Sequence, residues 1–120
     1  MNKEFYFINE EIDFYVVNDK IKRKLVARGG DMMIVEVHFE EGAVGDLHQH
    51  IHEQVSYCIS GKLEFEVNGE KQIIGAGDSV FMPIDSIHGC TVLEKAVLLD
   101  IFTPQREDFL ALQAEADAAK

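Results

Sequence analysis

Three histidines stand at alternate positions of this chain, His48, His50 and His52, and Gln54 follows at the same spacing. In an extended strand, side chains two residues apart point to one face of the sheet, so His48 and His50 would reach a common point. Neutral imidazole is the commonest protein ligand for transition metals. The stretch therefore predicts a metal site on a β scaffold, with further ligands supplied from elsewhere in the chain.

The overall composition is that of one globular domain. The chain has 120 residues and a formal net charge of −11, and an acidic protein is poorly suited to nucleic acid, whose phosphates attract basic surfaces. A small anionic substrate is compatible with this charge, because a local positive site can lie inside an acidic protein. No apolar run reaches the length of a membrane span, and the N-terminal residues lack the pattern of a signal peptide. We therefore expect a cytoplasmic protein that binds neither nucleic acid nor membrane.

The two cysteines, Cys58 and Cys90, match no C-x-x-C spacing and lie within apolar segments. Reduced, buried thiols are expected here rather than a disulfide or a zinc pair. Cys90 comes two residues after His88, which leaves open an accessory role near a site.

Short alternating segments separated by glycine turns make up most of the chain. Residues 1–20 predict an N-terminal arm or edge strand that ends at the Asn18-Asp19 turn. Residues 21–28 alternate, so that one face carries Ile21, Arg23, Leu25 and Ala27 and the other carries Lys22, Lys24 and Arg28. Arg23 lies on the apolar face, where it either lays its stem over the edge of the core or lines a pocket.

Further strands are expected at residues 32–40, 62–67, 71–74, 79–82, 88–93 and 96–103. His38 shares the polar face of its strand with Glu36, which favours a surface or rim histidine over a metal ligand. Asn68-Gly69 is a strong signal for a two-residue hairpin.

The segment 96–103 is apolar on both faces except for Asp100, and a carboxylate is costly there unless it is paired or hydrogen-bonded. Thr103 is expected to cap a short helix with Pro104 at its first position. That helix would carry Phe109, Leu110 and Leu112, and the tail after it is expected to fray. Many short strands and one terminal helix indicate an all-β barrel or sandwich.

The chain resembles the cupin superfamily through two spaced motifs. Gly42, His48, His50 and Gly61 fit the first motif, G-x5-H-x-H-x3-E-x6-G, with Gln54 in the glutamate position. Gly77, Pro83 and His88 fit the second, G-x5-P-x-G-x2-H-x3-N, with Asp85 in place of the glycine and Val92 in place of the asparagine. The resemblance implies an all-β double-stranded β-helix, a jelly-roll barrel with a short C-terminal helix. It also implies His48, His50, Gln54 and His88 as ligands of one divalent transition metal.

The ligand set leaves two alternatives and the identity of the metal open. First, a bulge in the strand would let Glu53 displace Gln54 as a metal ligand. Second, His52 lies on the same face as His48 and His50 and could bind the metal, although its cupin counterpart is usually a packing residue. Three neutral histidines and a glutamine leave a divalent ion with its full charge, which favours a Lewis acid over a site tuned for oxygen. Nickel, zinc, iron, manganese and copper all suit this set.

Three segments carry a closer resemblance to the KdgF-type cupins of pectin and alginate breakdown: MMIVEVHFEEGAVGDLHQH, HEQVSYCISGKLEF and LLDIFTPQREDFL. That family linearises 4,5-unsaturated monouronates. The resemblance implies a metal-dependent ring-opening enzyme. We expect a single cupin domain over 1–120, with the arm at 1–20, the two motifs at 42–61 and 77–92, and the C-terminal helix and tail at 104–120.

The same resemblance places the proton-transfer role on Asp100, whose burial would raise its pKa toward the working pH. The alternative is that Asp100 orients a ligand histidine or caps a turn. Arg106 would capture the uronate carboxylate, or else be a surface charge in the first turn of the helix. Phe102 would form an apolar wall for the sugar ring. Tyr57 is a weaker pocket candidate that suits the core better.

The expected partners are a small anionic sugar and a second copy of the chain, since small cupins often pair through their sheets. Two other functions stay open. One is a non-catalytic cupin that binds a sugar or a metal, and the other is a cupin dioxygenase, which the missing glutamate disfavours.

Overall fold

The structure, a computed structural model, describes residues 5–118. A short 3-10 helix, η1, is followed by eight strands and one α-helix. Their bounds are η1 Asn9–Glu11, β1 Tyr15–Asn18, β2 Ile21–Gly29, β3 Met32–Phe39, β4 Val44–His48, β5 Glu53–Val67, β6 Glu70–Gly75, β7 Ser79–Met82, β8 His88–Thr103 and α1 Glu107–Ala118. All strand pairs are antiparallel. Among the described residues, no helix is long or apolar enough for a membrane crossing.

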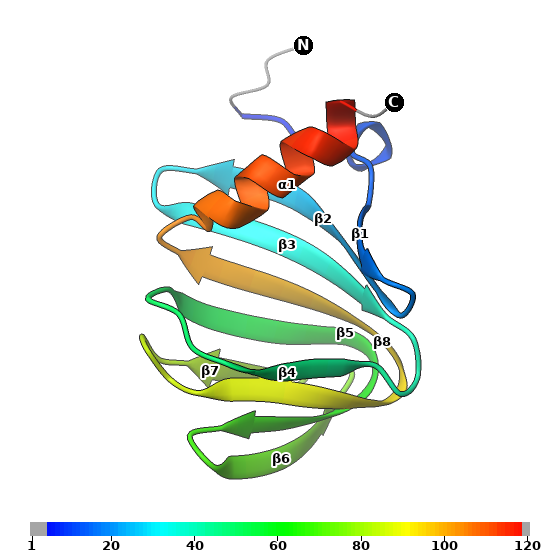
Figure 1. The fold of residues 1–120 in the computed structure, drawn as a ribbon, viewed down its shortest axis with the longest axis vertical. Coiled ribbons are helices and arrows are strands. Elements are labelled where there is room, and N and C mark those ends of the chain that lie inside the picture. The colour runs from blue at the N-terminus through cyan, green and yellow to red at the C-terminus, as the bar shows by residue number, and fades with distance from the viewer. Residues whose placement is uncertain (1–4, 119–120) are drawn as a thin grey trace.

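Two long strands, β5 and β8, pair along almost their whole length and connect the two halves of the fold (Figure 1). The first half of β5 pairs with β7 and with the second half of β8, which continues through β3 and β2 to β1. The second half of β5 pairs with β6 and with the first half of β8, which also carries β4. The predicted all-β jelly-roll with a short C-terminal helix is confirmed.

Alternation along the strands builds the core, as the sequence pattern predicts. In β3 every second residue is buried, and β5 alternates in the same way from Gln54 to Cys58. Apolar side chains of β2, β3, β5, β6, β7 and β8 fill the interior. The core cluster consists of Leu25, Met33, Val35, Val37, Phe39, Ala43, Cys58, Leu63, Phe65, Ile74, Met82, Val92, Ala96, Leu98 and Phe102.

Gly61 occupies the point where β5 and β8 change partners. Its φ is +91°, and a Cβ atom placed on it would clash with the carbonyl of Lys95 and lie 2.5 Å from the Cα of Ala96. The pairing of β5 with β8 shifts register on both sides of this residue. Only glycine combines a left-handed φ with so close an approach of backbone to backbone.

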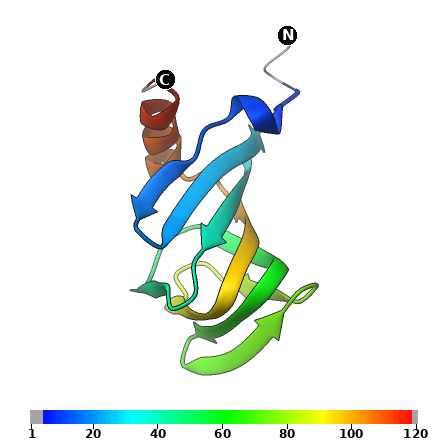
Figure 2. The same cartoon turned by 90° about the vertical axis from the view of Figure 1, so that its right-hand side faces the viewer.

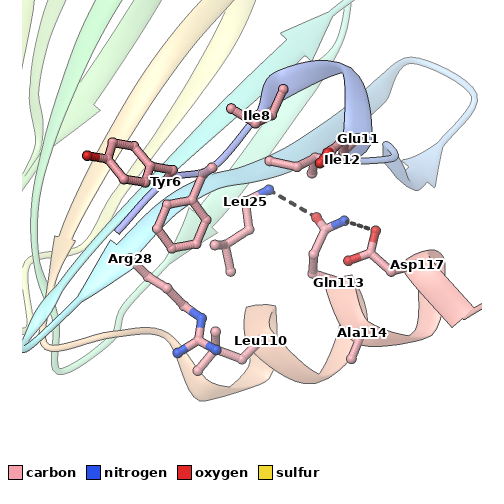
Figure 3. Close-up of a pocket in the computed structure, with 11 residues that line it drawn as sticks. Tyr6, Ile8, Glu11, Ile12, Leu25, Arg28, Leu110, Gln113, Ala114 and Asp117 are labelled. Carbon is pink, nitrogen blue, oxygen red and sulfur yellow. Dashed lines mark hydrogen bonds between the residues drawn. The ribbon is translucent and has the colours of Figure 1, made fainter. Parts of the chain in front are cut away.

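The helix α1 closes one end of the molecule beside the N-terminal segment (Figures 1 and 2). Its anchor is Gln113, a buried side chain whose Oε1 accepts a hydrogen bond from the Leu25 amide at 3.0 Å. The Gln113 Nε2 donates to the Asp13 carbonyl at 2.8 Å and to Asp117 Oδ1 at 3.2 Å. A cavity of about 400 Å³ lies between this helix, β2 and residues 6–12 (Figure 3). None of the histidines lines it.

One sequence prediction about local structure is wrong for a physical reason. The helix begins at Glu107 rather than at Pro104, because Thr103 is still paired with Glu53 as the last residue of β8. Of the tail expected to fray, residues 114–118 belong to the helix, and residues 119–120 lie outside the described residues.

The predicted faces of residues 21–28 are correct only as far as Leu25. A bulge between Leu25 and Ala27 shifts the register with β3. As a result Arg28 lines the same cavity as Leu25 instead of lying on the opposite face. The strands expected at 88–93 and 96–103 form one continuous strand, β8, and the strand expected at 62–67 is the second half of the longer β5.

Gly61→Ala is expected to lower the free energy of unfolding by about 3–5 kcal/mol, since it adds overpacking to a left-handed backbone. Gly77→Ala is the matched control, because Gly77 has a φ of +89° but no atom within 4 Å of the point where an alanine methyl group would lie. It should cost only about 1–2 kcal/mol. Chemical denaturation of both variants measures the difference, and equal losses would contradict the role of the close approach.

Candidate functional site

Three of the five histidines come together where β4 ends and β8 begins. His48 is the last residue of β4 and pairs with His88, the first residue of β8. His50 follows in the loop between β4 and β5. One nitrogen from each ring lies within 4.8 Å of the others. The alternate spacing suggests a single extended strand, whereas two strand ends and a loop bring the three histidines together in the structure.

The hydrogen bonds of the three rings leave one nitrogen of each without a proton. Each Nδ1 faces a main-chain carbonyl: His48 faces Asp46 at 2.8 Å, His50 faces His52 at 3.0 Å, and His88 faces Ser86 at 3.2 Å. A carbonyl only accepts, so each Nδ1 carries the hydrogen and each Nε2 keeps a free lone pair. Within the described residues, the buried Nε2 of His88 has no hydrogen-bond partner. This pattern of second contacts is typical of histidines that bind a metal.

Gln54 adds a fourth lone pair to the cluster. Its Oε1 lies 3.2 Å from the Nε2 of His50, while its Nε2 donates to the Ser56 hydroxyl at 3.0 Å. With Nδ1 of His50 acting as the donor, the two facing atoms are both acceptors. A cation between the acceptors would turn this unfavourable contact into a favourable one, so the residues fit a divalent metal.

The alternative ligands lie elsewhere. Glu53 is exposed, pairs with Thr103, and is on the face of β5 opposite to Gln54. His52 does not join the histidine cluster, and its ring packs edge-on against Phe102 with centroids 6.4 Å apart.

Burial favours the neutral form of two of the clustered imidazoles, His50 and His88. It lowers the pKa of His88 to about 4, and the neighbouring rings of His48 and His50 add to the effect. The pKa of His50 is also lowered, first by burial and then by the charge of Arg106. A neutral ring is the form that binds a metal, so these shifts let protons compete less well for the site.

Asp100 lies on β8 directly opposite Ser56 of β5. The Ser56 hydroxyl donates to its Oδ1 at 2.6 Å. Burial raises the pKa of Asp100 to about 6, although hydrogen bonding from Ser56 and Gln54 and the charge of Arg106 oppose the shift. A carboxyl group with such a pKa can take up and release a proton near neutral pH.

Arg106 precedes α1, and its guanidinium lies over Phe109 at 4.0 Å from the ring centroid and 5.3 Å from that of Phe102. Asp108 holds it in a two-point contact, to Nε at 3.1 Å and to Nη2 at 2.8 Å. This contact lowers the pKa of Asp108. The Arg106 side chain is only 14% exposed. It is therefore an oriented cation near the histidines, not a free surface charge.

Phe102 and Arg23 occupy the space around this cation. Phe102 is buried and lies edge-on to His50, with ring centroids 6.0 Å apart, and to Phe109 at 5.6 Å. Arg23 lies over Phe109 at 3.9 Å and over Tyr15 at 4.7 Å, and burial lowers its pKa. Both side chains lie on the inner side of the sheet.

The pattern of a known cupin domain matches residues 35–102. The pectin degradation protein KdgF of Dickeya dadantii is 42% identical over 107 residues, which cover 88% of this chain and 97% of the relative. The chain belongs to the KdgF-type cupins. Among solved structures, KdgF from Halomonas sp. has a TM-score of 0.82 at 42% identity, covering 87% of this chain and 98% of that one. An RmlC-like cupin from Shewanella frigidimarina has a TM-score of 0.85 at 34% identity, covering 89% and 96%.

The departure from the second cupin motif at Asp85 has a conformational explanation. Asp85 adopts a φ of +59° in the loop before His88. Aspartate tolerates this left-handed region better than most residues. The loop is also tied to the first motif, because the Asp85 amide donates to the His50 carbonyl at 2.9 Å and the Gln49 side chain donates to the Asp85 carbonyl at 2.8 Å. The cupin loop thus keeps its shape without a glycine.

Tyr57 is placed differently from both sequence interpretations. Its side chain is 43% exposed on the outer face of β5, because Gln54, Ser56 and Cys58 take the inner face. Neither the pocket role nor the core role is correct. Conversely, the sequence interpretation missed Ser56 and Asp108. Ser56 follows Gln54 by two residues, so strand parity alone would have put it at the site.

Asp100→Asn is expected to stabilise the metal-free protein at neutral pH by about 3 kcal/mol. The folded state holds the Asp100 proton up to about pH 6, whereas the unfolded chain releases it near pH 4. This group therefore costs stability progressively as the pH rises through that window. Asparagine carries no charge and still accepts from Ser56. The stability difference between the proteins, from denaturant titrations after chelation, should grow from about pH 4 to pH 7. A difference that does not change with pH would contradict the assignment.

Proposed function

We propose that this cupin holds one divalent transition metal through His48, His50, Gln54 and His88 and opens the ring of 4,5-unsaturated monouronates from pectin or alginate breakdown. The observation that carries the proposal is the convergence of four proton-free lone pairs beside a half-buried acid and an oriented arginine. The similarity to a relative named as a pectin degradation protein supports the same substrate class.

The bound metal would supply Lewis-acid chemistry by polarising substrate oxygens. All four proposed ligands are neutral, so the ion would keep a net charge of +2 and attract an anionic sugar. Nickel, zinc, iron, manganese and copper all suit the donor set. Carboxylate, ring oxygen and hydroxyl groups of the uronate would then lie between the histidines and Arg106.

Arg106 is suited to hold the substrate carboxylate. Asp108 takes the Nε hydrogen and one Nη2 hydrogen of the guanidinium, so Nη1 and the second Nη2 hydrogen are available to the substrate. Phe102 would give the sugar ring an apolar wall between the arginine and His50. Such contacts fix one orientation of the ring, which is the precondition for a directed proton transfer.

Asp100 would move the proton. Ring opening removes the hydrogen of the anomeric hydroxyl, breaks the bond between the anomeric carbon and the ring oxygen, and adds a proton to the far carbon of the double bond. The product is a linear aldehyde with a keto group, and no atom is gained or lost. A carboxyl group with a pKa of about 6 can accept the first proton and deliver the second.

The pure, metal-loaded protein is expected to accelerate the loss of the double-bond absorbance of unsaturated galacturonate. Removing the metal with a chelator should abolish the acceleration, and re-addition should restore it. Asp100→Asn should lower kcat by about 100-fold or more, the usual scale of acid–base catalysis. Arg106→Gln should raise KM with a smaller effect on kcat, since it removes a ground-state contact.

Ile73→Ala is a control for this assay, because Ile73 is an exposed residue on β6, away from the proposed ligands. Its kinetics should match those of the wild type. Tight uronate binding without turnover would instead favour a non-catalytic sugar-binding cupin. Oxygen consumption with a thiol or phenol substrate would favour a dioxygenase.

We also propose that the protein acts in the cytoplasm as a homodimer. The two free thiols support a reducing compartment. An apolar patch on the outer sheet face supports pairing with a second copy: Val55, Tyr57 and Ile59 of β5 and Phe81 of β7 are all exposed, and Val55 pairs directly with Phe81. An apolar patch on so acidic a chain suits contact with an identical surface.

Phe81→Glu is expected to turn the dimer into a monomer, because two buried carboxylates would face each other across a two-fold axis. Sedimentation velocity at matched concentrations measures the change. Ile73→Glu, at an exposed position on β6 outside the patch, should leave the dimer intact. A wild-type protein that sediments as a monomer would contradict the proposal.

A further inference from the structure

Ser56 lies between the proposed metal ligand Gln54 and the proposed proton carrier Asp100, and its side chain is fully buried. Its oxygen accepts from Gln54 Nε2 at 3.0 Å, and its hydroxyl donates to Asp100 Oδ1 at 2.6 Å. The register of β5 and β8 sets Ser56 directly opposite Asp100. Gln54 shares the inner face with Ser56, because they are two residues apart on one strand.

The direction of these hydrogen bonds follows from the number of protons available. A serine hydroxyl has one hydrogen, and here the carboxylate of Asp100 receives it. The Ser56 oxygen can then only accept, so it selects the NH2 end of the Gln54 amide, which is also hydrogen-bonded to the Asp100 carboxylate. The carbonyl end of Gln54 is thereby turned to His50, whose Nε2 lies 3.2 Å away.

This selection matters because the two ends of a glutamine amide have nearly the same size and shape. With the oxygen toward the histidines, Gln54 offers a lone pair to a cation. With the nitrogen toward them, it offers two hydrogens and repels the cation. The buried surroundings of Gln54, which is 7% exposed, leave little water to satisfy either end.

We propose that Ser56 is a positioning residue that holds the Gln54 amide with its oxygen toward the metal site. This inference rests on the proposed metal site of the previous subsection. It assigns the task of making glutamine act as a ligand to a residue whose type the first cupin motif leaves unspecified. Groups that orient metal ligands in this way typically contribute about 10- to 100-fold to metal affinity.

The test measures cobalt(II) affinity by chelator competition at about pH 8, where carboxylates are ionised, with no substrate present. Ser56→Ala is expected to weaken binding about 10- to 100-fold. Ser56→Thr, which keeps the hydroxyl, should restore most of the affinity. Cys58→Ala is the matched control, because Cys58 is equally buried two residues further along the same face. It should bind like the wild type.

A double-mutant cycle separates positioning from a general loosening of the strand. If Ser56 acts through Gln54, Ser56→Ala should add less than about 2-fold to the loss already caused by Gln54→Ala. The visible absorption spectrum of bound cobalt in Ser56→Ala should also shift toward that of Gln54→Ala. Additive losses or an unchanged cobalt spectrum would overturn the inference. So would a Ser56→Ala protein that folds and binds cobalt like the wild type.

The result is independent of the proposed reaction. A protein that binds cobalt as expected, loses affinity in Ser56→Ala, and does not act on uronates would refute the enzyme function and leave the positioning role standing. Uronate turnover by the wild type, together with full affinity in Ser56→Ala, would refute only the positioning role.

Discussion

The close approach of β5 and β8 at Gly61 is the constraint on which the rest of the structure depends. The two strands run side by side for most of their length, and both change partners at this point. The second half of β5 and the first half of β8 form the part of the barrel with β4 and β6, whereas the first half of β5 and the second half of β8 continue to β7 and β3. These latter halves carry Gln54, Ser56, Asp100 and Phe102 on the inner side. A side chain at position 61 would separate the strands and move the whole group.

The site that these strands carry consists of polar groups whose hydrogen bonds and charges are only partly paired with one another. Main-chain carbonyls of the loops fix the protonated nitrogens of the three histidines, and this leaves the other nitrogens free. Asp100 has a raised pKa although Ser56 and Gln54 hydrogen-bond its carboxylate. Arg106 is clamped by Asp108 against an aromatic ring. Each arrangement costs folding free energy, which the surrounding apolar core must offset.

Much of this could be predicted from the sequence, because strand alternation and fixed spacings are local properties. The pattern of residues 32–39 predicts the buried face of β3, the Asn-Gly turn predicts the β5–β6 hairpin, and the paired motifs indicate the cupin fold. The spacing of the histidines and the resemblance to cupins both predict the histidine cluster. The cluster does not form on one extended strand, however, because two strand ends and a loop bring the three rings together. His50 comes from a loop that Asp85 holds in place.

What the sequence could not provide depends on interactions between distant segments. The bulge in β2 is set by pairing with β3, so the face of Arg28 could not be read from alternation. The start of α1 depends on how far β8 stays paired with β5, which overrides the capping signal at Thr103. Tyr57 was misplaced although the parity of Gln54 already assigned it to the outer face. The Arg106–Asp108 contact and the stacking on Phe109 required the path of the chain beyond β8.

The left-handed backbone at Asp85 has a consequence for finding distant relatives. A motif written as letters treats the glycine at this position as a chemical requirement, whereas the molecule needs only a residue that accepts a positive φ. A search pattern that admits asparagine or aspartate at this position would select for the positive φ of the loop instead of for glycine itself. It would retrieve chains that a glycine-only pattern discards, and such chains would still be able to set the histidine of the second motif at the start of its strand.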